Sequence, residues 1–125
     1  MFLVDTNIFL EILLEQEKKE DCKAFLKKNS GAICISDFSL HSIGVILFRN
    51  KKPELFSDFI KDTMPNVRII TLPADAYQDL PKTKKKFGSD FDDSYQYLIA
   101  KNLKLDVVTL DSDFKGFSDL NVKFL

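Results

Sequence analysis

Short apolar runs alternate along the chain with longer segments in which hydrophobic residues recur at helical spacing. The runs predict strands at Phe2–Val4, Ala32–Ile35, Val67–Ile70, Asp106–Thr109 and Val122–Phe124. The longer segments predict helices over Thr6–Glu15, Lys18–Asn29, Phe38 to about Asn50, Glu54–Thr63, Pro73–Leu80 and Ser89 to about Leu103. Lys82–Lys86 is expected to form a basic connector, and Ser112–Phe114 a turn.

Capping signals support several of these helix starts. Either Ser36 or Asp37 can cap the helix that follows the second strand, because short polar side chains accept hydrogen bonds from free backbone N–H groups. Pro53 stands where the first turn of a helix tolerates proline. Ser89 is followed three residues later by the acid Asp92, which resembles a capping box.

The order of these elements predicts the fold class. The strands are short, apolar on both faces and separated by helices, a pattern typical of a parallel sheet covered on both sides. We therefore expect an α/β fold. The 125 residues show no repeat or linker-like composition, so a single domain over residues 1–125 is expected.

Composition narrows the cellular setting. No apolar stretch reaches the roughly 18–20 residues that cross a bilayer, so no membrane contact is expected. The opening residues lack the basic region and cleavage site of a signal peptide, and a cytoplasmic location follows as an expectation. Cys22 and Cys34 lie in apolar surroundings without metal-ligand spacing, and we expect both to be core thiols rather than a disulfide.

Overall charge does not indicate nucleic-acid binding. The net charge is −1 and the pI is near 5.8, whereas a protein that binds nucleic acid through a broad positive surface is usually basic. If nucleic acid is a partner, a local basic patch must attract it and part of the acidic charge must lie in a metal site.

Aspartates follow the ends of predicted strands. Asp5 ends the first strand, Asp111 follows the fourth with Asp113 two residues on, and Asp92 and Asp93 open the preceding helix. Ligands of open parallel sheets bind at the carboxyl ends of the strands. Carboxylates gathered there would repel one another, and Mg²⁺ or Mn²⁺, which favour oxygen ligands, would relieve the repulsion.

Each group of acids also has a purely structural interpretation. Acids are favoured at the N-terminus of a helix, which accounts for those that open the predicted helix at residue 89. The acids after the fourth strand could cap backbone N–H groups in a turn. Asp5, followed by Thr6-Asn7, could be an N-cap, but its place beside the core favours a site.

The same residues resemble the motifs of the PIN-domain family, especially its VapC-type toxin ribonucleases. Val4-Asp5-Thr6-Asn7 resembles the first motif, Asp93-Ser94-Tyr95 followed by Ile99-Ala100 is similar to the third, and Val108–Phe114 resembles the closing Thr-x-Asp motif. The resemblance covers the whole chain in order and spacing. Each motif is weak alone, and the ordered set is fairly specific.

The second motif departs from the family pattern. A Glu is normal on the helix after the second strand, and here His41 stands at about that place. His41 could ligate metal as neutral imidazole, or it could be a structural helix histidine that shares a face with Phe38, Val45 and Phe48. Asp37, one turn earlier, could compensate or could be a helix cap.

The resemblance implies a three-layer α/β/α fold around a mainly parallel sheet of four to five strands. It implies a Mg²⁺- or Mn²⁺-dependent endoribonuclease, such as the toxin of a type II toxin–antitoxin pair, with an antitoxin partner and a homodimer. Asp5, Asp93 and Asp111 would be catalytic metal ligands, bound directly or through water. Asp113 would be a peripheral ligand or would orient water, and Asn7, Thr109 and His41 would support the site.

Other features bear on the substrate. Lys82, Lys84, Lys85 and Lys86 could hold the RNA backbone by charge, or could simply be solvated. Tyr95 and Tyr97 could stack a base, although on an amphipathic helix at least one is expected in the core.

Two rival functions stay open at this point. One is a catalytically impaired PIN-like module that binds RNA or a protein, which would account for His41. The other is a phosphatase, which is disfavoured because Asp5-Thr6-Asn7 lacks the second Asp of a phosphoaspartate motif.

Overall fold

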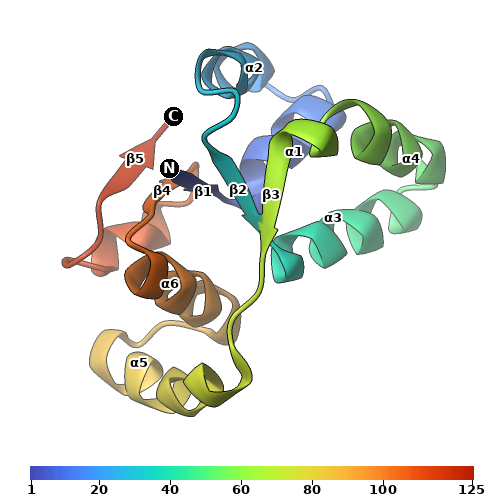
Figure 1. The fold of residues 1–125 in the computed structure, drawn as a ribbon. Coiled ribbons are helices and arrows are strands. Elements are labelled where there is room, and N and C mark those ends of the chain that lie inside the picture. The colour runs from blue at the N-terminus through green and yellow to red at the C-terminus, as the bar shows by residue number, and fades with distance from the viewer.

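The computed structural model describes residues 1–125, and its central feature is a five-stranded parallel sheet (Figure 1). The strands are β1 Phe2–Val4, β2 Ile33–Ser36, β3 Val67–Ile70, β4 Asp106–Thr109 and β5 Val122–Phe124. The α-helices are α1 Thr6–Leu13, α2 Lys19–Lys28, α3 Asp37–Arg49, α4 Pro53–Asp62, α5 Leu80–Phe87 and α6 Phe91–Leu103. Three 3₁₀ segments are η1 Met64–Asn66, η2 Ala74–Asp79 and η3 Ser112–Gly116.

The strand order is β3-β2-β1-β4-β5, and every neighbouring pair is parallel. The central strand β1 pairs with β2 on one side and β4 on the other, in a register that sets Val4 beside Val108. All five carboxyl ends therefore lie along one edge of the sheet.

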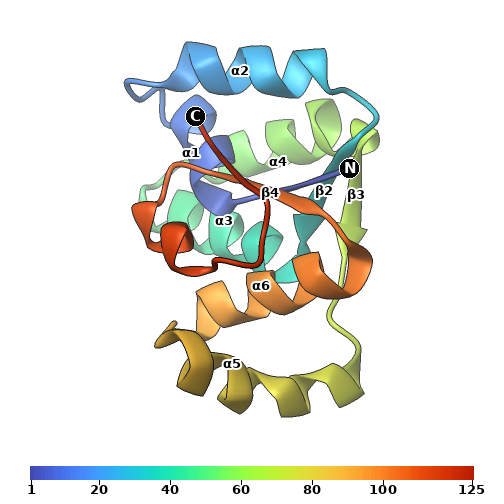
Figure 2. The same cartoon turned by 90° about the vertical axis from the view of Figure 1, so that its left-hand side faces the viewer.

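Helices cover both faces of the sheet in three layers (Figure 2). On one face, α1–α4 pack over a core that includes Val4, Ile35 and Val108. On the other face, α6 packs over Leu3, Cys34 and Val107, and α5 lies outside α6. Successive residues of β1 and β4 thus enter opposite cores, as the alternation of side chains along a strand requires. The α/β/α expectation is confirmed.

The two cysteines lie in these cores. Cys22 is buried with the α1–α4 layer and Cys34 with the α6 layer, and both are free thiols, as expected.

The segment around residues 73–88 differs from the sequence expectation. Residues 74–79 form the 3₁₀ segment η2 in place of the expected helix Pro73–Leu80, and Lys82–Lys86, expected as a connector, lies within helix α5. Leu80 and Thr83 are buried on the inner face of α5, where their i, i+3 spacing packs them against α6. Gly88 ends α5 in the left-handed conformation with φ 70°.

Helix α6 begins one residue later than the sequence signal indicated. The N-cap is Asp90, whose Oδ1 accepts a 2.9 Å hydrogen bond from the Asp93 backbone N–H. Ser89, expected as the cap, instead bonds side chain to side chain with Ser94. At α3 the cap is Ser36, one of the two expected candidates.

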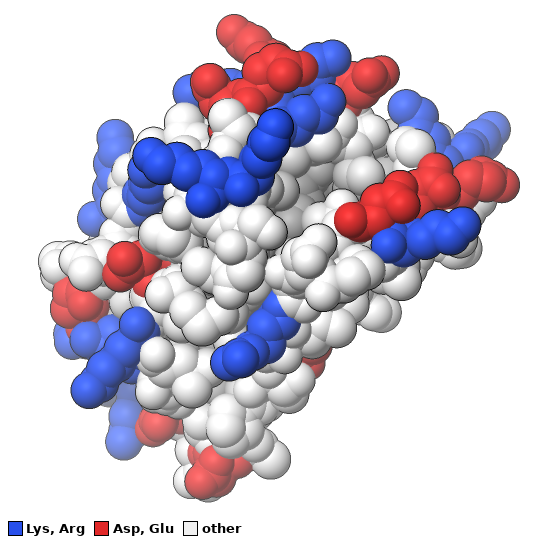
Figure 3. All heavy atoms as spheres, turned by 45° about the horizontal axis from the view of Figure 1, so that its top comes forward, with Lys and Arg blue, Asp and Glu red and all other residues white.

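Lysine and arginine side chains are interspersed with acids on the face drawn in Figure 3, and uncharged atoms fill the middle of that view. None of the helices combines the length and apolar character that a membrane span requires.

Candidate functional site

The site begins where β1 and β4 end side by side. The Asp5 backbone N–H donates to the Val108 carbonyl over 2.9 Å, which continues the strand ladder one residue past β1. Asp5 is buried and is also the N-cap of α1, so one residue ends the strand and starts the helix. Its carboxylate is therefore fixed at the carboxyl edge of the sheet.

The Asp5 carboxylate accepts four hydrogen bonds. Oδ1 accepts from the Thr6 backbone N–H at 2.7 Å and from Gln96 Nε2 at 2.8 Å. Oδ2 accepts from Thr109 Oγ1 at 2.7 Å and from Asn7 Nδ2 at 3.2 Å. Two donors on each oxygen fill the lone-pair directions of a carboxylate. Burial nevertheless holds the Asp5 pKa above the ordinary aspartate value.

Thr109 and Asn7 tie this carboxylate to the next acidic residue. Thr109 Oγ1 accepts from the Asp111 backbone N–H at 2.9 Å while donating to Asp5, and Asn7 Oδ1 accepts from the Leu110 backbone N–H at 3.2 Å. The two side chains therefore couple the start of α1 to the chain that leaves β4.

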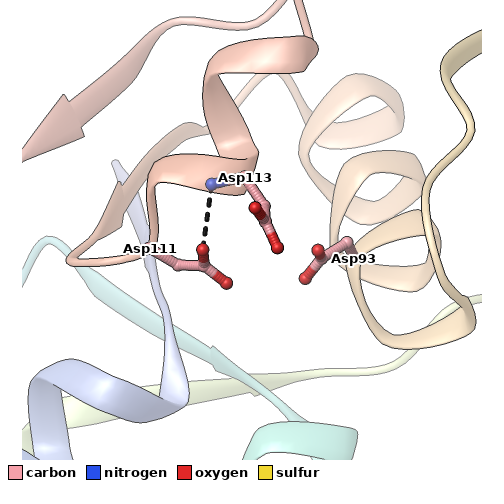
Figure 4. A group of neighbouring side chains, drawn as sticks. All are labelled: Asp93, Asp111 and Asp113. Carbon is pink, nitrogen blue, oxygen red and sulfur yellow. Dashed lines mark hydrogen bonds between the residues drawn. The ribbon is translucent and has the colours of Figure 1, made fainter.

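Three other carboxylates converge beside Asp5. Asp93 from the first turn of α6, Asp111 after β4 and Asp113 in η3 each offer one oxygen, and these oxygens lie within 4.8 Å of one another (Figure 4). Asp111 Oδ1 also accepts a 2.9 Å hydrogen bond from the Asp113 backbone N–H, which makes Asp111 the cap of η3. The start of α6, the end of β4 and the 3₁₀ segment η3 thus meet at one place. We call these three carboxylates the Asp93–Asp111–Asp113 cluster.

The carboxyl group of Asp93 has a strongly raised pKa. Burial, reinforced by the negative charges of Asp90, Asp111, Asp5 and Asp113, raises the pKa of Asp93 to about 7. Repulsion of this kind is relieved by a proton or by a cation.

The donor set fits a hard divalent cation. Mg²⁺ binds oxygen at about 2.1 Å, so ligands on opposite sides of it stand about 4.2 Å apart. The oxygens of the Asp93–Asp111–Asp113 cluster are spread over at most 4.8 Å, which a small adjustment of side chains or a bridging water would accommodate. No nitrogen or sulfur ligand belongs to the cluster, in keeping with Mg²⁺ or Mn²⁺.

The remaining candidate residues lie outside the cluster. His41 is exposed on α3, where it lines a groove of about 700 Å³ with Phe48 and Phe56. The side chains of Lys82, Lys84, Lys85 and Lys86 are exposed on α5. Of these, Lys82 pairs with Asp79 and Lys86 with Asp119.

Tyr95 and Tyr97 both belong to the core, so neither offers a free face for stacking a base. Each is at most 7% exposed. The Tyr95 hydroxyl donates to Asp37 Oδ1 at 2.6 Å and accepts from the Leu72 backbone N–H at 3.1 Å. The Tyr97 hydroxyl donates to Asp119 Oδ2 at 2.7 Å. These bonds satisfy the polar ends of two buried rings.

Gln96 was missed by sequence reasoning. Its side chain is 4% exposed, its Nε2 donates to Asp5 Oδ1, and its Oε1 is buried with no hydrogen-bond partner. Gln96 follows Asp93 by three residues, so both lie on one face of α6. The feature of the sequence that could have indicated Gln96 is its polar side chain between Tyr95 and Tyr97, within a helix that opens with an acidic motif.

The sequence profile of the PIN domain matches residues 2–120. No curated protein matches the chain significantly. The matched residues run from the start of β1 to just beyond η3, so they include all of the aspartate motifs.

Solved structures share the fold. VapC20 from Mycobacterium tuberculosis, described as a sarcin-ricin loop cleaving toxin, aligns with a TM-score of 0.83 at 14% identity over 98% of this chain and 99% of its own. A chain of VapBC2 from Rickettsia felis, bound to a promoter DNA fragment, aligns with a TM-score of 0.82 at 16% identity over 98% and 97%. A chain of FitAcB from Neisseria gonorrhoeae aligns with a TM-score of 0.73 at 22% identity over 100% and 97%.

Identities this low indicate a common fold alone, whereas the profile match covers nearly the whole chain. The order of the acidic residues, the carboxyl edge at which they meet and this match agree. The chain belongs to the PIN-domain family.

Proposed function

We propose that this protein is a Mg²⁺- or Mn²⁺-dependent endoribonuclease that serves as the toxin of a type II toxin–antitoxin pair. The observation that carries the proposal is the Asp93–Asp111–Asp113 cluster, in which three carboxylates from separate elements lie within 4.8 Å. PIN domains are typically nucleases that need a divalent metal, and this cluster has the ligand chemistry for one. RNA would meet such an enzyme in the cytoplasm, the location we propose.

The cluster would hold the cation through Asp93 and Asp111, with Asp113 at its periphery. When bound, the cation would activate a water and neutralise charge on the scissile phosphate. Asp5 lies beside the cluster, and its four hydrogen bonds hold its carboxyl group in a fixed orientation. We propose that Asp5 acts on the metal centre through a water, because its oxygens already accept two donors each.

Lysines on α5 are proposed to attract the RNA backbone. α5 packs against α6, and Lys84 lines a hollow together with Asp90, which also borders the hollow that contains Asp93 and Asp113. Lys84 and Lys85 make no ion pair, and the 3.4 Å hydrogen bond from Lys84 Nζ to the Ser89 carbonyl is one that a phosphate could replace. Lys82 and Lys86 share theirs with Asp79 and Asp119 over 4.0 and 3.8 Å, and such exposed pairs are weak enough to exchange.

The direct test is cleavage of labelled structured and unstructured RNA with Mg²⁺ or Mn²⁺. Wild-type protein should cut, EDTA should stop it, and Asp111→Asn and Asp5→Asn should each lose about ten- to a hundred-fold in rate. The matched control is Asp106→Asn, which alters an aspartate at the opposite end of β4. Pure wild-type protein that binds RNA but never cuts would favour the impaired binding module, and equal cutting by all variants would identify a contaminant.

An antitoxin is proposed as the protein partner. The structural neighbours include a toxin–antitoxin complex from Klebsiella pneumoniae. On this chain the groove between α3 and α4 exposes Phe48 to 63%, which suits an apolar segment of such a partner. Co-expression with the product of a neighbouring small gene, comparing wild type with Phe48→Asp, would test this. The homodimer stays a prediction, for sedimentation analysis to check.

A further inference from the structure

A second hollow, of about 570 Å³, opens beside the acidic cluster between η2, α5 and the start of α6. Its lining is largely apolar, and two aromatic side chains project from it into solvent. Tyr77 is 43% exposed and Phe91 is 54% exposed. Lys84 and Asp90 stand among the lining residues. Exposed aromatic rings that line one hollow are typical of a surface that binds a ligand or a partner.

A buried ring supports the two exposed ones. The Tyr77 ring centroid lies 5.8 Å from that of Tyr95, and the Phe91 centroid lies 6.5 Å from it with only 19° between the planes. Tyr95 is held by hydrogen bonds at its hydroxyl to Asp37 and to the Leu72 backbone N–H. Tyr77 and Phe91 thus rest on a fixed base and need little ordering before they bind a ligand.

This hollow adjoins the proposed metal centre. Asp90 borders it and also borders a polar hollow of about 380 Å³ that contains Asp93 and Asp113. Phe91 and Asp93 are two residues apart on α6, so their side chains point to different sides of the helix. A strand that places a base in the aromatic hollow would therefore pass over Asp90 to reach the acids.

We propose that this hollow binds an unpaired nucleobase of the RNA, next to the phosphodiester that the acidic cluster would cleave. The inference rests on the proposed ribonuclease function and specifies its substrate as single-stranded at the cut. Every nucleobase offers a flat face for Phe91 and Tyr77, which makes such stacking tolerant of sequence. Lys84, on the rim, supplies the positive charge that the adjoining phosphate needs.

Charge as well as shape favours a nucleotide as the occupant of this hollow. Lys84 Nζ donates a long 3.4 Å hydrogen bond to the Ser89 carbonyl, so an apolar peptide would leave its charge without an anionic partner. A nucleotide presents both an aromatic ring and an anionic phosphate, so it matches the rings and Lys84 together. It also has the neighbouring phosphate that the acids, through a cation, would engage.

Binding is best measured in the Asp111→Asn variant, which is expected to hold RNA without cutting it. The probes are a fluorescein-labelled single-stranded RNA of about ten nucleotides carrying one 2-aminopurine, and a blunt RNA duplex. We expect the single strand to bind, with 2-aminopurine fluorescence quenched by stacking, and the duplex to bind at least about five-fold more weakly.

Substitutions then separate stacking from charge. Phe91→Ala and Tyr77→Ala should each weaken single-strand binding about five-fold or more and remove the quenching, whereas Phe91→Trp should keep both. The control Leu103→Ala alters an exposed apolar side chain at the far end of α6 and should bind like its parent. Lys84→Ala should reduce the salt dependence of binding by about one phosphate contact and leave the quenching in place.

These measurements separate a failure of the base site from a failure of the ribonuclease proposal. If the parent binds RNA and Phe91→Ala binds it equally well, the base site is wrong while the ribonuclease proposal stands. If the parent binds no RNA at all, both are overturned. If Phe91→Ala instead converts a dimer to a monomer in sedimentation, with RNA binding per chain unchanged, the hollow is a contact between two copies and the base site is overturned.

Discussion

Thr109 Oγ1 donates a 2.7 Å hydrogen bond to Asp5 Oδ2, joining residues 104 positions apart. The bond follows from the parallel register of β1 and β4, which sets the ends of these two strands next to each other. Because the same hydroxyl accepts from the Asp111 backbone N–H, one side chain links the buried Asp5 to the Asp93–Asp111–Asp113 cluster.

Replacing Thr109 by valine should destabilise the fold. The substitution keeps the shape but removes a donor to a buried carboxylate and an acceptor for a backbone N–H, a loss of about 1–3 kcal/mol. Urea unfolding followed by circular dichroism measures it. Thr109→Ser should recover most of the loss, and Thr71→Val, at an exposed threonine, should change little. Equal stability of Thr109→Val and wild type would show that the hydroxyl contributes nothing.

Gln96 is predicted to be a positioning residue for Asp5. Gln96→Glu would place two carboxylates 2.8 Å apart in a buried site, where they must share a proton. The unfolded chain releases that proton near the ordinary carboxyl pKa, so the variant should lose stability as pH rises from 5 to 8. Melting temperatures at both pH values check this.

Gln96→Leu separates the hydrogen bond from the charge. It should lower the rate of RNA cleavage and weaken Mn²⁺ binding, measured by calorimetry, without the pH-dependent loss of stability. Gln78→Leu, at an exposed glutamine in η2, is the control. Unaltered Mn²⁺ binding in Gln96→Leu would remove Gln96 from the site.

Divalent metal should stabilise the protein more at high pH than at low pH. The pKa of Asp93 is raised from 3.8 to about 7, chiefly by burial, so between these values the folded protein holds a proton that the unfolded chain has lost. Stability of the metal-free protein from this group therefore falls as pH rises through that window. Mn²⁺ replaces the proton, and its effect on the melting temperature should grow from pH 5 to pH 8.

Asp93→Asn provides the matched comparison. Removing one charge from the cluster should raise metal-free stability at pH 8 and largely abolish the response to Mn²⁺. A variant that still gains as much as wild type from Mn²⁺ would place the cation elsewhere.

His41→Glu should leave the fold intact, because the side chain at this position is exposed on α3. Changes at exposed positions away from special contacts usually alter stability by less than about 0.5 kcal/mol. If the position faces the metal centre when RNA is bound, cleavage should be kept or raised. The paired measurements are melting temperature and cleavage rate. A fall in cleavage with an unchanged melting temperature would mean that histidine itself is needed.

Local patterns in the sequence determined most of the secondary structure. Each of the five strands lies within one residue of the apolar run that predicted it. The central strands β1, β2 and β4 are largely apolar because both of their faces are buried, whereas the edge strands β3 and β5 are partly exposed. The lysine-rich stretch of α5 was misinterpreted because its charges conceal a narrow inner face of Leu80 and Thr83, which becomes apparent only against α6.

For the site, the sequence located Asp5, Asp93, Asp111 and Asp113 at element ends, and motif spacing indicated their family. Only the tertiary structure decided that Asp93, Asp111 and Asp113 form a cluster and that hydrogen-bond donors surround the Asp5 carboxylate. Those relationships depend on the sheet register and on side chains such as Gln96, whose bond to Asp5 spans 91 positions. Short-range periodicity carries no information about contacts at that separation, because they form only when the strands and helices pack.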